Sequence, residues 1–575
     1  MLKNYTPLTL WKDFDPTECP LESSLYKTFD KDGVTVQIYT FCGRKIGKQS
    51  SRVLAYVAFK PQKKEKAQPA LIVVDPLNRV NVDNHCFWAK LGYTAIGIDY
   101  LGESEEHGGL MTIYPVSLAF ADFDNAKDKL YTVTEDAQKT CWYEWTLNTR
   151  RAVTFAQSLA QVDGEKIGLY SLKEGNVITL QAMAIDQRIK AGAVLHGNLW
   201  ENVEEVDDSG FNSYNVADLE RQMEESCRHD EWLAAISPQS YLSYVKQPFY
   251  TCVGTNSPNT DMDKTYDCLL RMGNNGAGVV LFAPRMMDSL PSNYTSNLQK
   301  WFDHLLRERS NIMMQNVNVK IDVFEQNKQL VVKARATDLP VNAKASLYYC
   351  HNRVGTESSR NWIEVPMKRT DDGLVAALQI YSPATPITAF CNVTFRNGVN
   401  ISSNLLKFVP SKKFDMSNVT LSRRTPILYN NSQEEAEFTP MNIMGTQTTE
   451  FIDRHPVSFV VGAQGIKGVC GTNMGSFVVC DDKVLYNEHS LLMLDAYSVN
   501  EQDLNVYLIY HWGEPTHAAY KRTVRLAGGN IWQKITLART DFKNEQTGKS
   551  PEMRDIRAIC FGSKDGVVLN NILFT

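Results

Sequence analysis

The sequence predicts an α/β domain with a mostly parallel, doubly wound sheet, followed by two all-β sandwich domains, the last of them jelly-roll-like. Up to about residue 310, short continuous apolar runs alternate with helical segments, the pattern of a parallel sheet covered on both faces. Beyond that point strand-like segments recur at roughly ten to twenty residues between polar turns, which is typical of β-sandwiches. A chain of 575 residues is long enough for several such domains.

The first domain is expected over residues 1–310. Its helical segments are 84–91, 175–184 and one that ends at 301–306. The long stretch 197–246 between two strands is expected to be a cap-like insertion. The expected strands are 34–40, 52–59, 70–74, 94–98, one that ends at 168–170, 191–196, 249–253 and 279–282.

The two all-β domains are expected over residues 315–410 and 446–575. Residues 411–445 are polar and poor in strand-forming runs, so we expect a linker there. Strands of the middle domain are expected at 317–323, 330–336, 345–350, 374–381 and 387–395. Those of the last domain are expected at 458–462, 491–497, 504–511, 523–526, 532–537, 556–561 and 567–574.

Composition excludes several functional classes. The 60 basic and 65 acidic residues give a net charge of −5, which does not indicate binding to nucleic acid or to an anionic membrane. No run of about 18 apolar residues predicts a membrane span, and no apolar signal segment opens the sequence, so we expect a cytoplasmic protein. The 12 cysteines form no CxxC pair and are expected to be buried free thiols. No histidine pair has metal-ligand spacing, so no metal or cofactor is expected.

Four segments of the first domain carry a recognisable pattern. They read PALIVV (69–74), LGYTAIGIDYLG (91–102), KIGLY (166–170) and WFDHLL (301–306). The pattern resembles the α/β-hydrolase superfamily, more narrowly the acetyl xylan esterase and dienelactone-hydrolase-like group. The resemblance implies that the first two lead to the oxyanion loop and a conserved turn, the third enters the nucleophile elbow, and the fourth is the closing helix. The segment WQKITL (532–537) is similar to carbohydrate-binding-module sandwiches.

The nucleophile elbow departs from the pattern of that family. The usual motif is G-x-S-x-G, whose small residues let a strand turn sharply into a helix and expose the serine. Aligned on Gly168 and Gly175, the motif here reads S-x-K-x-G, with Lys173 at the nucleophile position and Ser171 in place of the first glycine. Lysine attacks carbonyls usefully through Schiff bases, and an amide formed from an acyl group would not turn over by hydrolysis.

The other two triad positions are also substituted by this comparison. The resemblance places the acid at Asn256 or Ser257, and the histidine at Asp288. An aspartate with an ordinary pKa of about 4 cannot act as a base for serine at neutral pH. We hypothesise that Lys173 and Asp288 form an ion pair instead, since a sheltered lysine needs a partner charge.

Several residues are candidates for ligand binding or for an alternative catalytic group. His196 closes an apolar strand at the edge where ligands bind in open α/β sheets. Trp512, in a turn beside Gly513, is a candidate exposed platform for stacking on a sugar. If an esterase triad exists, the alternative nucleophile is Ser171, with His196 or His107 as the base. The expected ligand-binding residues are Leu77, Asn78, Glu174, His196 and Trp512.

Three functions remain open from the sequence. The first is a degenerate α/β-hydrolase that binds a carbohydrate, an acylated small molecule or a partner protein. The second is a working carboxylic-ester hydrolase, which would need a Ser or Cys side chain in the crevice within reach of a histidine. The third is a structural interaction module. The sequence leaves the oligomeric state and the ligand undetermined.

Overall fold

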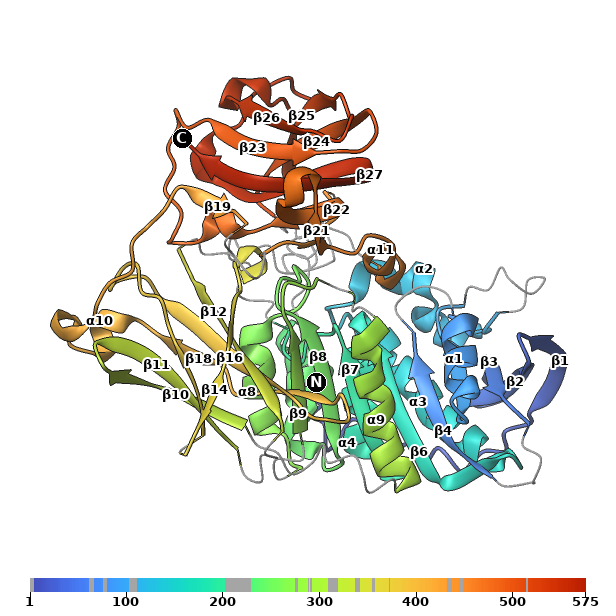
Figure 1. Ribbon diagram of the computed structural model, residues 1–575. Coiled ribbons are helices and arrows are strands. Elements are labelled where there is room, and N and C mark those ends of the chain that lie inside the picture. The colour runs from blue at the N-terminus through green and yellow to red at the C-terminus, as the bar shows by residue number, and fades with distance from the viewer. Residues whose placement is uncertain are drawn as a thin grey trace.

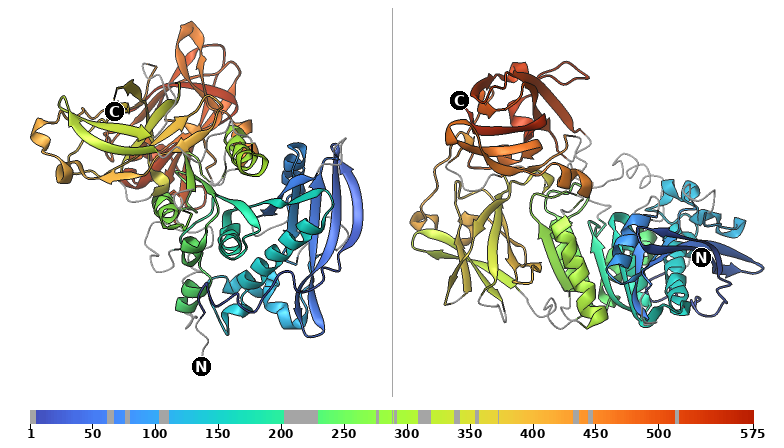
Figure 2. Two further views of the ribbon diagram at one scale, coloured as in Figure 1. Left: turned by 90° about the horizontal axis from the view of Figure 1, so that it is seen from below. Right: turned by 45° about the vertical axis from the view of Figure 1, so that its right-hand side comes forward.

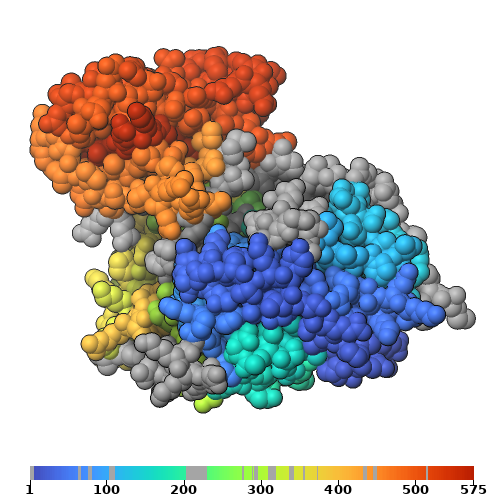
Figure 3. Space-filling model, turned by 90° about the vertical axis from the view of Figure 1, so that its right-hand side faces the viewer, coloured from blue at the N-terminus to red at the C-terminus, as the bar shows by residue number. Residues whose placement is uncertain are grey.

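The computed structural model has three parts that follow one another along the chain (Figure 1). An α/β domain comes first, a β-sandwich packs beside it, and a second β-domain lies over the junction of the two (Figures 1 and 2). Figure 3 shows the last domain, in orange and red, above the N-terminal part of the first domain, in blue. The structure describes residues 5–575 except 62–66, 76–79, 103–110, 202–228, 275–277, 288, 290–291, 309–318, 337–341, 354–356, 372, 432–436, 444–447 and 513–515.

The first domain is built on a nine-stranded mixed sheet in the order β1-β2-β3-β5-β4-β6-β7-β8-β9. Strands β1, β2, β3 and β5 pair antiparallel, and β5, β4, β6, β7, β8 and β9 pair parallel. All the strands expected in this domain are present. The strands are β1 (Ser24–Lys31), β2 (Val34–Ile46), β3 (Gln49–Phe59), β4 (Gln68–Val74), β5 (Thr94–Asp99), β6 (Val162–Leu172), β7 (Ile189–Leu195), β8 (Phe249–Gly254) and β9 (Gly278–Ala283).

Helices cover both faces of this sheet, which confirms the doubly wound α/β class. On one face Val74 and Val194 lie in a core with α3 (Cys141–Ser158), α4 (Asn176–Ile185) and α8 (Met262–Arg271). On the other face Val73 and Leu195 lie in a core with α1 (Val82–Lys90) and α9 (Ser292–Arg307). Shorter helices are α2 (Phe123–Ala126), α6 (His229–Ala235), α7 (Pro238–Tyr241), α10 (Pro410–Lys413) and α11 (Thr449–Arg454).

The middle domain is a sandwich of two antiparallel sheets. Both sheets contribute to one apolar core, which continues into the α1 and α9 face of the first domain. One sheet contains β10 (Val319–Gln326), β11 (Gln329–Ala336), β15 (Gly373–Ala377) and β14 (Lys368–Thr370). The other contains β13 (Ile363–Pro366), β12 (Lys344–His351), β16 (Ile387–Thr394), β17 (Asn400–Ser402) and β18 (Leu406–Phe408).

The last domain is an antiparallel β-structure organised around one long strand. The two strands expected at 556–561 and 567–574 are a single strand, β27 (Ile556–Phe574), whose first half pairs with β24 and whose second half pairs with β23. The other strands are β19 (Ile427–Tyr429), β20 (Thr439–Pro440), β21 (Ser458–Val461), β22 (Lys467–Ser476), β23 (Leu492–Tyr497), β24 (Gln502–Tyr510), β25 (Ala518–Leu526) and β26 (Trp532–Leu537).

Part of the segment expected to be a linker belongs to the last domain. Strands β19 and β20 lie within 411–445 and pair with β27 and β22. With three and two residues they are too short to show an alternating pattern. Strand β22 was also not expected, because it is rich in glycine. A Cβ on Gly468 would lie 2.5 Å from the Leu569 carbonyl oxygen, so the close approach of β27 excludes a side chain there.

Two further properties bear on the environment of the protein. None of the described helices combines the length and the apolar character needed to cross a bilayer. The eleven cysteines in the described part of the chain are free, and most of them are buried.

Candidate functional site

The structure retains a sharp turn between β6 and α4. Lys173 lies at its tip with a φ of +47°, a left-handed conformation that is unfavourable for a residue with a side chain. Gly175 closes the turn, because a Cβ there would lie 2.8 Å from Ser171 Cβ and 2.9 Å from Val74 Cγ1. This strained strand-to-helix geometry resembles that of a nucleophile elbow, and Lys173 lies at its tip.

Ser171 does not lie in the site. It is fully buried on β6 against Gly175, and its hydroxyl makes no hydrogen bond within the described residues. It is not among the residues that line the pocket above the elbow. The structure therefore does not bring Ser171 into contact with His196.

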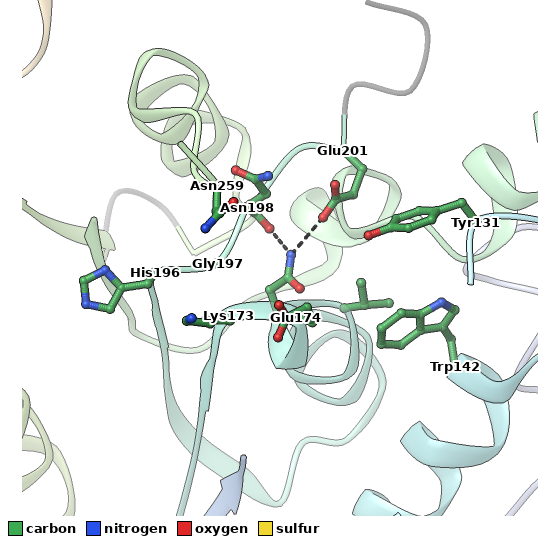
Figure 4. Close-up of a pocket in the computed structure, with 11 residues that line it drawn as sticks. Tyr131, Trp142, Lys173, Glu174, His196, Gly197, Asn198, Glu201 and Asn259 are labelled. Atoms are coloured by element: carbon green, nitrogen blue, oxygen red, sulfur yellow. Dashed lines mark hydrogen bonds between the residues drawn. The ribbon is translucent and has the colours of Figure 1, made fainter. Parts of the chain in front are cut away.

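A small pocket, with a cavity volume of about 30 Å³, lies directly above the elbow (Figure 4). In Figure 4, Lys173 and His196 lie on one side of it, and Tyr131 and Trp142 on the other. Trp142 donates its indole N–H to the Leu130 carbonyl, so it offers the pocket an apolar ring. The lining residues are Tyr131, Trp142, Lys173, Glu174, Asn176, Val177, His196, Gly197, Asn198, Glu201 and Asn259.

A chain of buried polar groups forms one wall of the pocket. Asn176, the first residue of α4, donates from Nδ2 to the Asn198 carbonyl and to Glu201 Oε1, the latter over 3.4 Å. Burial raises the pKa of Glu201 to about 7, the Asn176 hydrogen bond opposes the rise, and the charge of Glu174 adds to it. The side chain of Lys173 makes no hydrogen bond or ion pair with any residue the structure describes, whereas its carbonyl accepts from the Asn176 backbone N–H.

Two expected ligand-binding residues, Glu174 and His196, do line the pocket. His196 follows β7, is 6% exposed, and has a φ of +55°. Its backbone N–H donates to the Cys252 carbonyl over 2.8 Å, which fixes this turn at the carboxyl edge of the sheet. Leu77 and Asn78 lie outside the described residues.

The acid position faces away from the pocket. Asn256 is buried, and its Nδ2 donates to the carbonyls of Ser358 and Arg360 in the middle domain, over 2.9 and 2.8 Å. Ser257 donates its hydroxyl to Thr260 Oγ1 over 3.2 Å and does not line the pocket either. The residue of this loop that does line the pocket is Asn259.

The loop at the histidine position is packed beneath the last domain. Met287 is fully buried in a cluster with Phe477 and Trp512 of that domain. Asp288 and its hypothesised ion pair with Lys173 lie outside the described residues, as does His107.

Trp512 is not the exposed platform that the sequence suggested. It is fully buried, its ring lies 5.5 Å from that of Phe477, and its carbonyl accepts a hydrogen bond from the Ser358 hydroxyl over 3.0 Å. The turn position indicated exposure, but Trp512 itself is buried where the three domains meet. A large indole contributes most when it is buried, which explains its position there.

Sequence reasoning did not assign eight of the eleven residues that line the pocket, namely Tyr131, Trp142, Asn176, Val177, Gly197, Asn198, Glu201 and Asn259. Two of them had a signal in the neighbouring sequence, because Asn176 follows the elbow glycine and Asn259 lies in the loop after β8. Glu201 was assigned to the insertion, whose acidic residues suggested a solvated face. Tyr131 and Trp142 were not distinguished from core aromatics.

The fold and the elbow define the class of the first domain as an α/β-hydrolase fold. Residues 16–215 match the family model described as acetyl xylan esterase (AXE1), so this region is similar to that family. No curated protein matches the chain.

Solved structures give only weak likenesses. An acetyl xylan esterase from Paenibacillus sp. R4 is 15% identical, with 53% of this chain and 96% of that one covered and a TM-score of 0.42. Acetyl xylan esterase 1 from Thermoanaerobacterium sp. JW/SL YS485 is 14% identical, with 50% and 89% covered and a TM-score of 0.40. The family match over residues 16–215 is therefore the comparison that bears on this domain.

Proposed function

We propose that the pocket above the elbow binds a carbohydrate or an acylated small molecule, and that the domain does not hydrolyse esters through a serine triad. The observation that carries this proposal is Lys173 at the tip of the elbow, with a φ of +47°. A lysine that attacked an ester there would form a stable amide, so it could bind a ligand but not turn it over.

The walls of the pocket suit such a ligand. Trp142 and Tyr131 offer aromatic surface to the apolar face of a sugar ring or to an acyl group. Asn198, Asn259 and Glu201 offer amide and carboxyl groups to hydroxyls. The free cysteines favour a cytoplasmic location, which is part of the proposal.

The second candidate is an active carboxylic-ester hydrolase with an unconventional nucleophile. The similarity of residues 16–215 to acetyl xylan esterases favours it. It requires Ser171 to leave its buried position against Gly175, or another group to take its place.

Turnover of p-nitrophenyl acetate by the full chain, Lys173→Ala and Ser171→Ala separates the two candidates. The proposal expects the wild type to stay at background, and Lys173→Ala to weaken calorimetric binding of acetylated xylobiose. Lys190→Ala is the matched control, because Lys190 lies at the opposite end of β7 and pairs with Glu165. Turnover that Ser171→Ala abolishes would establish the esterase instead.

A further inference from the structure

One segment of the middle domain touches both other domains. It begins at His351, the last residue of β12, and includes residues 357–361. Toward the first domain, Arg360 forms a two-pronged ion pair with Asp263 over 2.9 and 2.8 Å, and the carbonyls of Ser358 and Arg360 accept from Asn256. Toward the last domain, Ser358 donates to the Trp512 carbonyl. The junction of all three domains therefore depends on this segment.

His351 forms the buried ionic contact between this segment and the last domain. Its side chain is 1% exposed, and that of its partner Asp481 is fully buried. His351 Nδ1 lies 3.2 Å from Asp481 Oδ1, and Nε2 lies 2.8 Å from the Gln379 carbonyl oxygen. Both partners are acceptors, whereas a neutral imidazole has a single N–H to donate. Both hydrogen bonds therefore form only when His351 is the imidazolium cation.

The Asp481 carboxylate forms an ion pair with His351 only in that state. Asn361 donates to Asp481 Oδ2 over 3.1 Å and also to Glu437, which Lys483 pairs with. The described titratable and charged groups around the pair are the carboxylates of Asp481, Asp482 and Glu437, the cations of Lys483, Arg424 and Arg353, and the phenols of Tyr349 and Tyr381. Arg353 donates to the Val484 carbonyl and does not contact Asp481 in the described structure. Loss of the His351 proton therefore leaves the buried Asp481 without its direct counter-charge.

The electrostatics agree with this geometry. Burial alone would lower the pKa of His351, but the Asp481 carboxylate outweighs it and raises the pKa above the ordinary 6.5. Burial alone would raise the pKa of Asp481, but the His351 cation and Lys483 lower it to about 2. A raised histidine pKa stabilises the contact below the ordinary value, and this stabilisation is lost as pH rises through the raised pKa. A lowered aspartate pKa sets the acidic limit, because its stabilisation is lost as pH falls toward 2.

We propose that His351 is a proton-operated latch that holds the last domain on the junction when protonated and releases it at alkaline pH. The same segment hydrogen-bonds Asn256, whose loop carries Asn259 into the pocket. Release of the last domain therefore loosens one wall of the pocket. This inference concerns domain docking and is independent of what the pocket binds.

The experiment combines a histidine titration with a measurement of shape on the full chain. Protein labelled with ¹³C at histidine is titrated by NMR from pH 5.5 to 9, and small-angle X-ray scattering follows the radius of gyration over the same range. We expect the His351 resonance to titrate above 6.5 and the protein to expand as it does. The ratio of docked to undocked protein should fall up to tenfold per pH unit above that pKa, as loss of one proton requires.

Two variants and a control make the test specific. Asp481→Asn keeps the shape of the partner but removes its charge, so the His351 pKa should fall and the pH response should flatten. His351→Gln assigns the resonance and should expand the protein at pH 5.5. His517→Gln is the control, because His517 bonds a single carbonyl, that of Ile443 in the preceding segment. A radius of gyration that does not change between pH 5.5 and 9 in the wild type would overturn the latch, and this measurement needs no variant. A His351 pKa at or below 6.5, once the resonance is assigned, would overturn it too.

Discussion

Asn256→Asp introduces a carboxylate at one of the two positions where the resemblance places the acid, and it should strongly destabilise the protein. In the wild type, Asn256 Nδ2 donates to two carbonyls over 2.9 and 2.8 Å, and Asn256 Oδ1 accepts from the Thr255 hydroxyl. Asn256→Ala removes two hydrogen bonds of about 1 kcal/mol each and leaves buried carbonyls unpaired, so we expect a loss of about 2–4 kcal/mol. Asn256→Asp should destabilise the protein more than Asn256→Ala at neutral pH, because a carboxylate oxygen would face those carbonyl oxygens.

The pH dependence of Asn256→Asp provides its signature. Burial against two acceptors raises the folded-state pKa of the new aspartate above its unfolded value of about 3.9. Its destabilisation is therefore small near pH 4, grows by about 1.4 kcal/mol per pH unit, and levels off once pH exceeds the folded-state pKa. If the folded-state pKa of the aspartate lies three units above the unfolded value, the destabilisation at pH 7.5 is about 4 kcal/mol.

Urea unfolding of the wild type, Asn256→Ala and Asn256→Asp at pH 4.5 and 7.5 checks this expectation. The aspartate variant should be the least stable at pH 7.5, and its deficit relative to alanine should shrink at pH 4.5. An aspartate variant as stable as the wild type at pH 7.5 would refute the reasoning, since the side chain could not then face the two carbonyls.

Three further substitutions test the elbow, the junction and the pocket. Trp512→Ala should cost about 3–5 kcal/mol, because it empties the fully buried site against Met287, and thermal unfolding should show a smaller loss for the half-buried Trp532→Ala. Gly175→Ala should cost about 1–3 kcal/mol, because its Cβ would lie 2.8 Å from Ser171 Cβ, and an unchanged melting temperature would contradict the close packing of the elbow. Glu201→Gln should gain stability relative to the wild type between pH 5 and 8, by up to about 3 kcal/mol, because a carboxyl whose pKa is raised to about 7 destabilises the fold above its unfolded pKa of about 4.3. A difference in melting temperature between Glu201→Gln and the wild type that is the same at pH 5 and pH 8 would contradict this prediction.

The α/β domain could be predicted because its central strands are buried on both faces. Strands β4, β5 and β8 are almost entirely buried, and such strands read as continuous apolar runs. Strand β1 was missed for the opposite reason, since most of its residues are exposed and its sequence SLYKTFDK has no continuous apolar run. Strand β22 was missed because its glycines accommodate neighbouring groups that only the folded structure brings close.

The site could be predicted only where its residues are neighbours in sequence. Ser171, Lys173 and Gly175 form one local motif, so a single glycine anchor identified the elbow. The Asn256 side chain bonds a middle-domain segment about a hundred residues later in the sequence. The Trp512 side chain packs on a loop more than two hundred residues earlier. A local sequence pattern carries no information about contacts between residues so far apart. The sequence therefore predicted an exposed Trp512 and an Asn256 in the site.

The elbow and its flanking loops follow different constraints in this chain. The backbone of the elbow is fixed by Gly175 and by the strained φ of Lys173, both of which depend on local packing of β6, β4 and α4. The loops after β8 and β9 are fixed by partners in other domains, through the donors of Asn256 and the buried Met287. A triad acid must offer a carboxylate to a histidine, whereas the amide of Asn256 is committed to two carbonyls of the middle domain. A carboxylate at position 256 would therefore face those two carbonyls, and a serine introduced by Lys173→Ser would need its acid from another residue.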